Sequence, residues 1–171
     1  MTALPAPTSR RIGAFLWDGL LVAGYAVVVA GVFLIVSILA PGSVENLFAT
    51  RWASHGIGFG VLTLSVIFAL GLADSGGAGF GKRRMGLRIE RTDGRPPGRI
   101  RSLLRTALKL LPWELAHTAL WEFRFAPDGA AGMLFLVACY VFAAVYLVTV
   151  AVDRNHRAPY DMLLGTRVVL S

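Results

Sequence analysis

Three apolar runs constrain the fold of this chain more than any other feature. They cover residues 12–40, 57–73 and 130–152, and only the first contains an ionisable carboxylate, Asp18. A helix of about 20 apolar residues crosses the ~30 Å hydrocarbon core of a bilayer. Charged residues make up 16% of the chain, against about 25% in an average soluble domain. We therefore expect an all-α integral membrane bundle with spans at about 10–40, 57–73 and 130–152.

The segment 99–121 mixes charge and apolarity as no other part of the chain does. Arg101, Arg105 and Lys109 recur every fourth residue and therefore share one face of a helix, while leucine and alanine cover the rest. This pattern is typical of an amphipathic helix that meets anionic lipid headgroups, so we assign lipid binding to these three side chains.

The same segment can either cross the bilayer or lie on its surface. A crossing at about 100–123 returns the basic tail 153–171 to the side that carries the basic loop, as the positive-inside rule favours. Pro112 and the charged residues around it argue for an interfacial helix. We expect a kinked fourth helix that crosses, in a single domain over residues 1–171.

Positive charge is concentrated in one part of the chain and predicts its orientation. The formal net charge is +7, and ten of the 17 basic residues lie between residues 82 and 109. In a membrane protein such clusters stay in the cytoplasm, which makes the loop 74–99 and both termini cytoplasmic in a cell membrane. The first apolar run is too long for a signal peptide, so we expect it to be retained as a span. Nucleic acid is not expected as a partner.

The loop 74–99 opens with glycines and a lysine in nearly the spacing of a nucleotide-binding P-loop. Arg83 stands where that motif needs Ser or Thr for magnesium, and an apolar span precedes it instead of a buried strand. We expect no nucleotide and no other cofactor. The alternation at 86–91 and the turn at 92–95 predict a small extended or hairpin element, and the apolar piece 162–169 is expected to fold back beneath the bundle.

Ionisable residues inside apolar segments are the candidate site. Asp18 is either an orienting charge near the interface or an ion or proton ligand. Glu114 and His117 share a helical face with Glu-x-x-His spacing, and they are either a helix–helix hydrogen bond or a titrating pair. Di-metal bundles need this motif twice, and it occurs here once, so no metal site is predicted. No arrangement of a nucleophile and a base stands out, and we expect no enzyme activity.

Several motifs in this order resemble the RDD family of small bacterial membrane proteins. They are RIGAFLWD at 11–18, GKRRMGLRI at 81–89, RSLLR at 101–105 and HRAPYDMLLGT at 156–166, and LPWELAH at 111–117 resembles one subgroup. The resemblance implies that the name-giving arginine and two aspartates are Arg11 (or its neighbour Arg10), Asp18 and Asp161. Transport, including monovalent cation/proton antiport, has been proposed for some members.

The expected function is therefore a small multi-pass transporter that moves a monovalent cation against protons. Asp18, Glu114 and His117 would bind the ion or proton, and Arg11 and Asp161 would pair at a gate. Four spans leave little room for a route through one chain, so we expect a homo-oligomer. The alternative is a membrane adaptor that binds anionic lipid or other membrane proteins through the basic loop and amphipathic helix.

Overall fold

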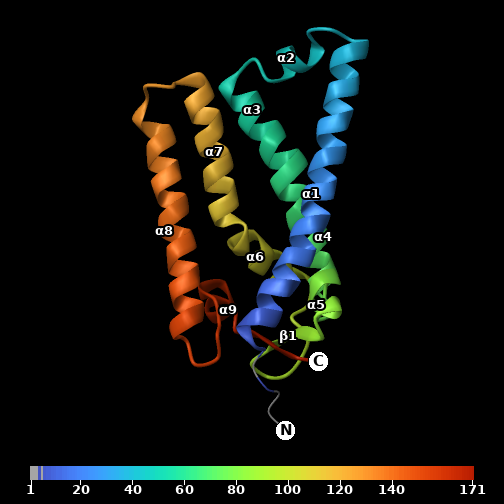
Figure 1. The fold of residues 1–171 in the computed structure, drawn as a ribbon, viewed down its shortest axis with the longest axis vertical. Helices are drawn as coiled ribbons and strands as arrows, with labels where there is room; N and C mark the ends of the chain where they lie inside the picture. The colour runs from blue at the N-terminus through green and yellow to red at the C-terminus, as the bar shows by residue number, and fades with distance from the viewer. Residues whose placement is uncertain (1–3, 5) are drawn as a thin grey trace.

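The computed structural model describes residue 4 and residues 6–171, and within these it contains three helices long and apolar enough to cross a membrane. They run roughly side by side along the length of the molecule (Figure 1). They are α1 (Thr8–Leu39), α8 (Ala130–Val152) and a continuous helix made of α3 (Arg51–Gly58), the π-helix η1 (Phe59–Leu64) and α4 (Ser65–Asp74). The all-α bundle is confirmed.

The second long helix begins at Arg51, six residues earlier than the predicted span at 57–73. Thr50 accepts a hydrogen bond from the backbone N–H of Ala53 through its side chain, at 3.3 Å, and so caps the helix at this earlier point. His55, which precedes the predicted span, therefore lies inside a helix. The connection itself is shortened to α2 (Ser43–Leu47) and its flanking turns.

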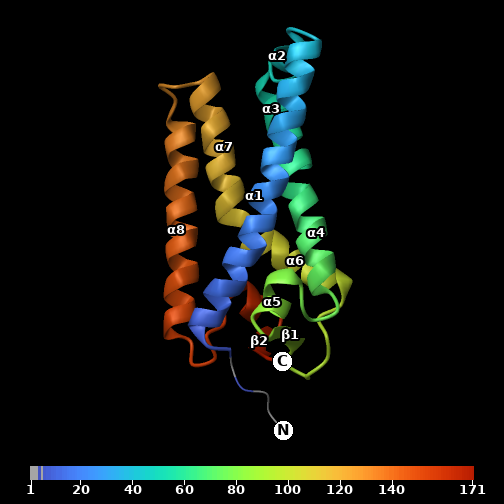
Figure 2. The same cartoon turned by 45° about the vertical axis from the view of Figure 1, so that its right-hand side comes forward.

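The kink predicted in the fourth helix is present as a break at Leu110, which separates α6 (Arg99–Lys109) from α7 (Leu111–Phe125). Pro112 lies in the first turn of α7, where its missing N–H costs no helical hydrogen bond. α7 then runs beside α8 in both side views (Figures 1 and 2). At Gly132 the two helices lie so close together that a Cβ atom would collide with the ring of Phe123.

A two-stranded sheet and two short helices close one end of the bundle. β1 (Leu87–Arg91) pairs antiparallel with β2 (Thr166–Leu170), so the extended element in the loop pairs with the C-terminal segment rather than forming a hairpin. α5 (Phe80–Arg84) precedes β1 and α9 (Pro159–Leu163) precedes β2. A small apolar core forms here, made of Ala6, Ala14, Leu87, Ile89 and Val168.

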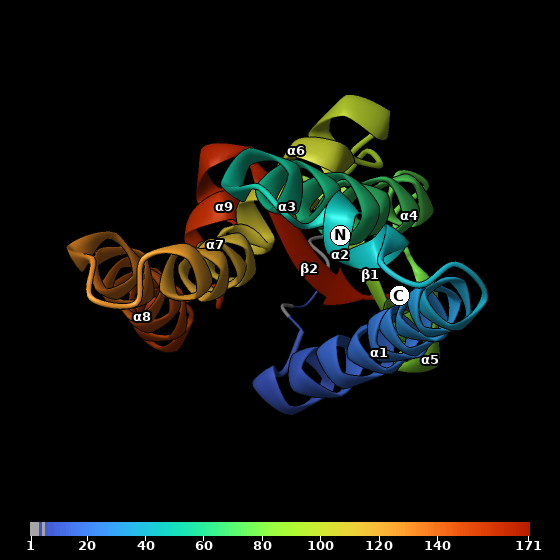
Figure 3. The same cartoon turned by 90° about the horizontal axis from the view of Figure 1, so that it is seen from above.

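We call this end, which carries both termini, α5, α9 and the sheet, the charged end, and the end with α2 and the α7–α8 turn the far end (Figure 1). Seen from above, α1, the α3–η1–α4 helix and the α7–α8 pair surround the sheet (Figure 3). Large apolar side chains on the long helices point outward, with Val27 71% and Leu147 73% exposed. Such a surface suits contact with lipid and not with water.

Candidate functional site

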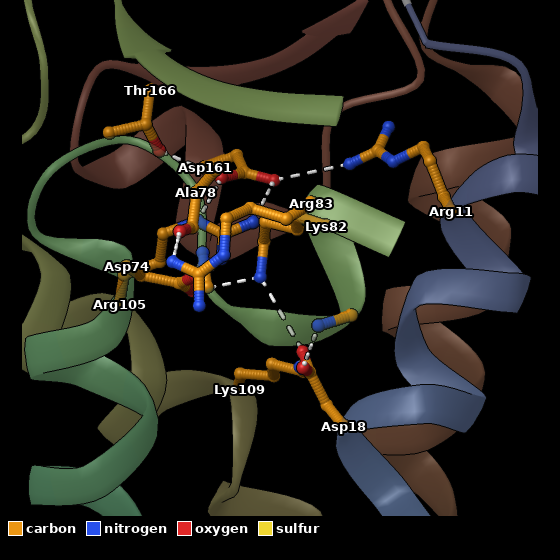
Figure 4. A network of polar contacts seen from close by, with 12 residues as sticks. Arg11, Asp18, Asp74, Ala78, Lys82, Arg83, Arg105, Lys109, Asp161 and Thr166 are labelled. Atoms are coloured by element: carbon orange, nitrogen blue, oxygen red, sulfur yellow. Dashed lines mark hydrogen bonds and ion pairs between the residues drawn. The ribbon is translucent and has the colours of Figure 1, made fainter. Parts of the chain in front are cut away.

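Asp161 is the most enclosed acid at the charged end, with 0% of its surface exposed. Its Oδ1 accepts hydrogen bonds from Arg105 Nε at 2.6 Å and from the Thr166 hydroxyl at 2.7 Å, and its Oδ2 accepts one from Arg105 Nη2 at 3.2 Å. Arg11 Nη2 lies 3.4 Å from the same Oδ2. This carboxylate therefore joins α1, α6, α9 and β2 (Figure 4).

The charge state of Asp161 follows from these partners. Burial by itself would raise the pKa of the carboxyl group, because it disfavours the charged form. The positive charge of Arg105 and the hydrogen bonds from Arg105 and Thr166 act in the opposite direction and hold the pKa of Asp161 below its ordinary value. Asp161 is thus a fixed negative charge at neutral pH, matched by the planar fork of an arginine.

Asp18 lies on α1 with 5% of its surface exposed. It accepts a hydrogen bond from the backbone N–H of Gly81 at 2.9 Å, and Lys82 Nζ and Lys109 Nζ lie 3.6 and 4.0 Å from its Oδ2. Gly81 is required for this contact, because a Cβ there would overlap the carbonyl oxygen of Ala14 and the Asp18 carboxylate. The glycine-rich segment therefore brings α5 against α1, which is a structural reason for the P-loop-like spacing.

Asp74, at the end of α4, completes the group. Its Oδ2 lies 2.8 Å from Lys82 Nζ and 3.8 Å from Arg105 Nη1, and its Oδ1 accepts a hydrogen bond from the backbone N–H of Gly79 at 2.9 Å. Lys82 therefore bridges Asp18 and Asp74, and Arg105 links Asp74 to Asp161 (Figure 4). We call this set the charge network: Arg11, Asp18, Asp74, Lys82, Arg105, Lys109, Asp161 and Thr166.

A second set of polar side chains lies along α7, facing the α3–η1–α4 helix. Glu114 accepts a hydrogen bond from the Thr63 hydroxyl of η1, and His117 Nδ1 lies 3.7 Å from a Glu114 oxygen. The indole N–H of Trp121 is 3.1 Å from His117 Nε2. The wide turn of η1 places Thr63 opposite Glu114, and π-helical turns of this kind are frequent at functional positions.

The same face of α7 carries Glu122, which is 7% exposed, toward the far end. His55 Nε2 lies 3.2 Å and Arg51 Nη1 3.4 Å from its two carboxylate oxygens. We call the whole set the α7 seam: Arg51, His55, Thr63, Glu114, His117, Trp121 and Glu122. Among the described residues, no hydrogen bond or ion pair joins the α7 seam to the charge network.

The structure groups the predicted site residues differently from the sequence. Arg11, Asp18 and Asp161 lie together in the charge network, whereas Glu114 and His117 lie in the α7 seam. Arg105 and Lys109, expected to meet lipid headgroups, point inward to Asp161 and Asp18, and Arg105 is 3% exposed. Arg101 and Lys109 keep partly exposed positions, whereas Arg105 is buried. The three side chains lie on one helix as the spacing predicts, but Arg105 and Lys109 meet carboxylates of other segments and not lipid headgroups.

Asp74 and Lys82 are network members that the sequence did not single out. Both lie in the basic loop 74–99, where a charged side chain is normally exposed to solvent and gives no sign of a buried contact. The glycines before Lys82 were the available signal, since Gly79 and Gly81 donate backbone hydrogen bonds to Asp74 and Asp18. Within the described residues, no group of three or more His, Cys, Asp or Glu side chains could hold a metal ion.

The charge network brings three carboxylates and four cationic side chains together beside apolar helices, which is an unusual setting for so many charges. Comparison of the chain with curated proteins and with solved structures found no significant match. A family model described as the RDD family matches residues 5–165. Since that match covers nearly the whole chain, this small membrane protein belongs to the RDD family.

Proposed function

We propose that this protein is a multi-pass transporter of the cell membrane that exchanges a monovalent cation for protons. The observation that carries the proposal is Asp18, a 5%-exposed carboxylate on a long apolar helix whose cationic neighbours are two lysines. A lysine can give up its proton when it is buried, whereas an arginine cannot. The positive charges beside Asp18 can therefore be lost by deprotonation of a lysine.

The proposed exchange of a proton for a cation needs only Asp18 and its two neighbouring lysines. An ammonium of Lys82 or Lys109 neutralises Asp18 in the observed state. When a lysine releases its proton and becomes a neutral amine, the carboxylate is free to bind one monovalent cation. One proton leaves as one cation binds, so charge is conserved at the site, and the reverse step returns the lysine to the carboxylate.

The remaining parts of the network and the seam have supporting roles in this proposal. Arg11, Arg105 and Asp161 join α1 to α6 and α9 through charges that do not titrate near neutral pH, which suits a gate on the charged side. Glu114 and His117 supply proton-accepting groups further along α7, toward the far end.

The topology in this proposal follows from the charge distribution. In this proposal both termini lie in the cytoplasm, as the basic residues of the charged end favour, and α7, which runs beside α8, is the fourth span. Four helices of one chain do not enclose a pathway for the ion, so in this proposal a homo-oligomer supplies the remaining helices that line it. Mass measurement of the purified protein in mild detergent tests the oligomer independently of transport.

Flux measurements in proteoliposomes test the transport proposal. Vesicles loaded with a pH-sensitive dye and given a sodium or potassium gradient should show cation-driven proton movement with the native protein and none with Asp18→Asn. Asp128→Asn, which removes an exposed acid in the α7–α8 turn, is the matched control and should retain native flux. Native flux in the Asp18→Asn protein would overturn the assignment.

A membrane adaptor is the second candidate, favoured by arginines that stay exposed at the charged end. Arg83, Arg84 and Arg88 are exposed, and the guanidinium of Arg84 lies over the rings of Trp17 and Phe80 at 5.6 and 5.3 Å. This reading predicts that neutralising the three arginines abolishes flotation with vesicle-bound partners while Asp18→Asn leaves it intact. The opposite pattern supports the transporter.

A further inference from the structure

A cavity of about 90 Å³ lies within the charge network. It is lined by four cationic side chains, Arg11, Lys82, Arg105 and Lys109, but by a single carboxylate, that of Asp18. One water needs about 10–15 Å³ by this kind of measure, so the cavity has room for several waters or for one tetrahedral oxyanion. With both lysines protonated, the lining therefore carries an excess of positive charge that favours an anion.

The balance of charge over the whole network points the same way. Three carboxylates, Asp18, Asp74 and Asp161, face the four cations, which leaves one positive charge without a counter-ion. Two other acids of the charged end are already engaged, because Asp153 pairs with Arg157 and Glu90 with Arg167. A buried charge without a partner is costly, so an anion in this space stabilises the folded state.

Two donors around the cavity are available for such an anion. Nη1 of Arg11 is buried and has no hydrogen-bond partner. Lys109 has only a 4.0 Å approach to Asp18 and a position 5.2 Å from the centre of the Phe15 ring, and its side chain is 15% exposed. The remaining two cations, Lys82 and Arg105, are bound more tightly to Asp74 and Asp161.

We propose that this cavity is a binding site for a phosphate-type oxyanion, held mainly by Arg11 and Lys109. Arginine and lysine are the side chains that recognise phosphate, by charge-assisted hydrogen bonds. The anion is either free inorganic phosphate or the phosphate of a lipid headgroup. The lipid source has a direct route, because Phe15 lines the cavity and is itself 58% exposed on the apolar surface of α1.

Binding is tested on the full chain in detergent, where no transport is required. Inorganic phosphate is titrated at constant ionic strength against chloride, with the melting temperature followed by tryptophan fluorescence. In parallel, native mass spectrometry counts lipids retained after extraction from vesicles of phosphatidylcholine with or without phosphatidic acid. A phosphate-dependent rise in melting temperature identifies the free anion, and a retained phosphatidic acid identifies the lipid.

Variants of opposite expected effect make the test specific. Lys109→Met removes the unmatched charge and should weaken binding about tenfold or more, as expected for loss of a charge-assisted hydrogen bond. Asp18→Asn increases the positive excess and should tighten binding. Arg99→Gln, an exposed position at the start of the same helix, should leave binding unchanged.

The proposal is overturned if neither source binds the native protein, or if Lys109→Met binds as tightly as the native chain. Should Lys109→Met fail to fold, Lys109→Gln and Arg11→Gln repeat the comparison with polar replacements, and native-strength binding in both overturns it as well. Because the readout is binding in detergent, failure of the transport proposal leaves this result unaffected, and the converse also holds.

Discussion

The charge network and the α7 seam are both polar regions inside an apolar bundle, but they are built in opposite ways. The charge network draws its residues from α1, α4, α5, α6, α9 and β2, and its acids meet lysines and arginines. The α7 seam joins only two long helices, and its acids meet histidines, a threonine and one half-exposed arginine, Arg51.

This difference determines how much each region contributes to the stability of the fold. Fixed charges from many segments hold those segments in one arrangement, and removing one of them leaves its partner uncompensated. The α7 seam joins fewer segments, and a neutral hydroxyl is among the partners of its acids, so losing one of its contacts leaves less charge uncompensated. The comparison therefore assigns the larger contribution to stability to the charge network and the smaller one to the α7 seam.

The largest effect is expected from Asp161→Asn, which removes the closest negative partner of the buried Arg105 and leaves it only the 3.8 Å approach to Asp74. Breaking a buried ion pair costs about 3–5 kcal/mol, so the free energy of unfolding in detergent should fall by that amount. Glu114→Gln in the α7 seam should cost only about 1 kcal/mol, the net value of one hydrogen bond. Equal losses in the two variants would remove the distinction between the regions.

Acid should act on the charge network next. Since the pKa of Asp161 is lowered by folding, the stability that its charge contributes is present above its unfolded pKa of about 4. That contribution is lost as pH falls through the lower pKa of the folded state. Unfolding followed from pH 6 down to pH 3 should thus show a loss that the Asp161→Asn variant lacks. An identical pH profile in the two proteins would show that Asp161 does not ionise as described.

Two glycines compare the tightness of packing in the two regions. Gly81→Ala places a methyl group against the backbone of Ala14 and should cost about 3 kcal/mol, the upper range for overpacking. Gly58→Ala meets the rings of His117 and Trp121, which can shift, and should cost about 1 kcal/mol. Gly60→Ala meets nothing within 4 Å and is the control. Thermal unfolding of the three variants ranks them, and a reversed order for Gly81 and Gly58 would contradict the tighter packing of the charge network.

The smallest effect is expected at the far end of the α7 seam. Glu122→Gln removes the partner of His55 and of Arg51, whose side chain is 44% exposed. Pairs of this kind contribute about 0.5–1 kcal/mol, because solvent screens the exposed partner. Chemical unfolding at low and high salt measures it, and the difference from the native protein should shrink as salt is added. A loss as large as that of Asp161→Asn would place the far end among the structural anchors.

Much of the fold could be predicted from the sequence, because hydrophobic length and helix-breaking residues act locally. The last span at 130–152 matches α8 residue for residue, and Pro112 marked the break between α6 and α7. The start of the second helix was missed because a short polar turn with a threonine cap precedes its apolar part.

The site was less predictable, because its contacts join distant segments. Arg105 and Asp161 are 56 residues apart, and Arg11 and Asp161 are 150 apart. The resemblance to a family marked Arg11, Asp18 and Asp161, but helical periodicity alone assigned Arg105 and Lys109 to lipid. Periodicity identifies which side chains share a face, and only the tertiary fold decides whether that face meets headgroups or carboxylates.

The position of Asp161 in the chain has a consequence for synthesis. Its two arginine partners, Arg11 and Arg105, emerge from the ribosome before it does, so for a time they lack the carboxylate that they meet in the folded chain. During insertion those charges can act as topological signals, which retain their segments on one side of the bilayer. Once the last residues arrive, the same charges are neutralised and become internal bonds. The same two arginines can therefore act twice, first as signals during insertion and then as partners of Asp161 in the folded chain.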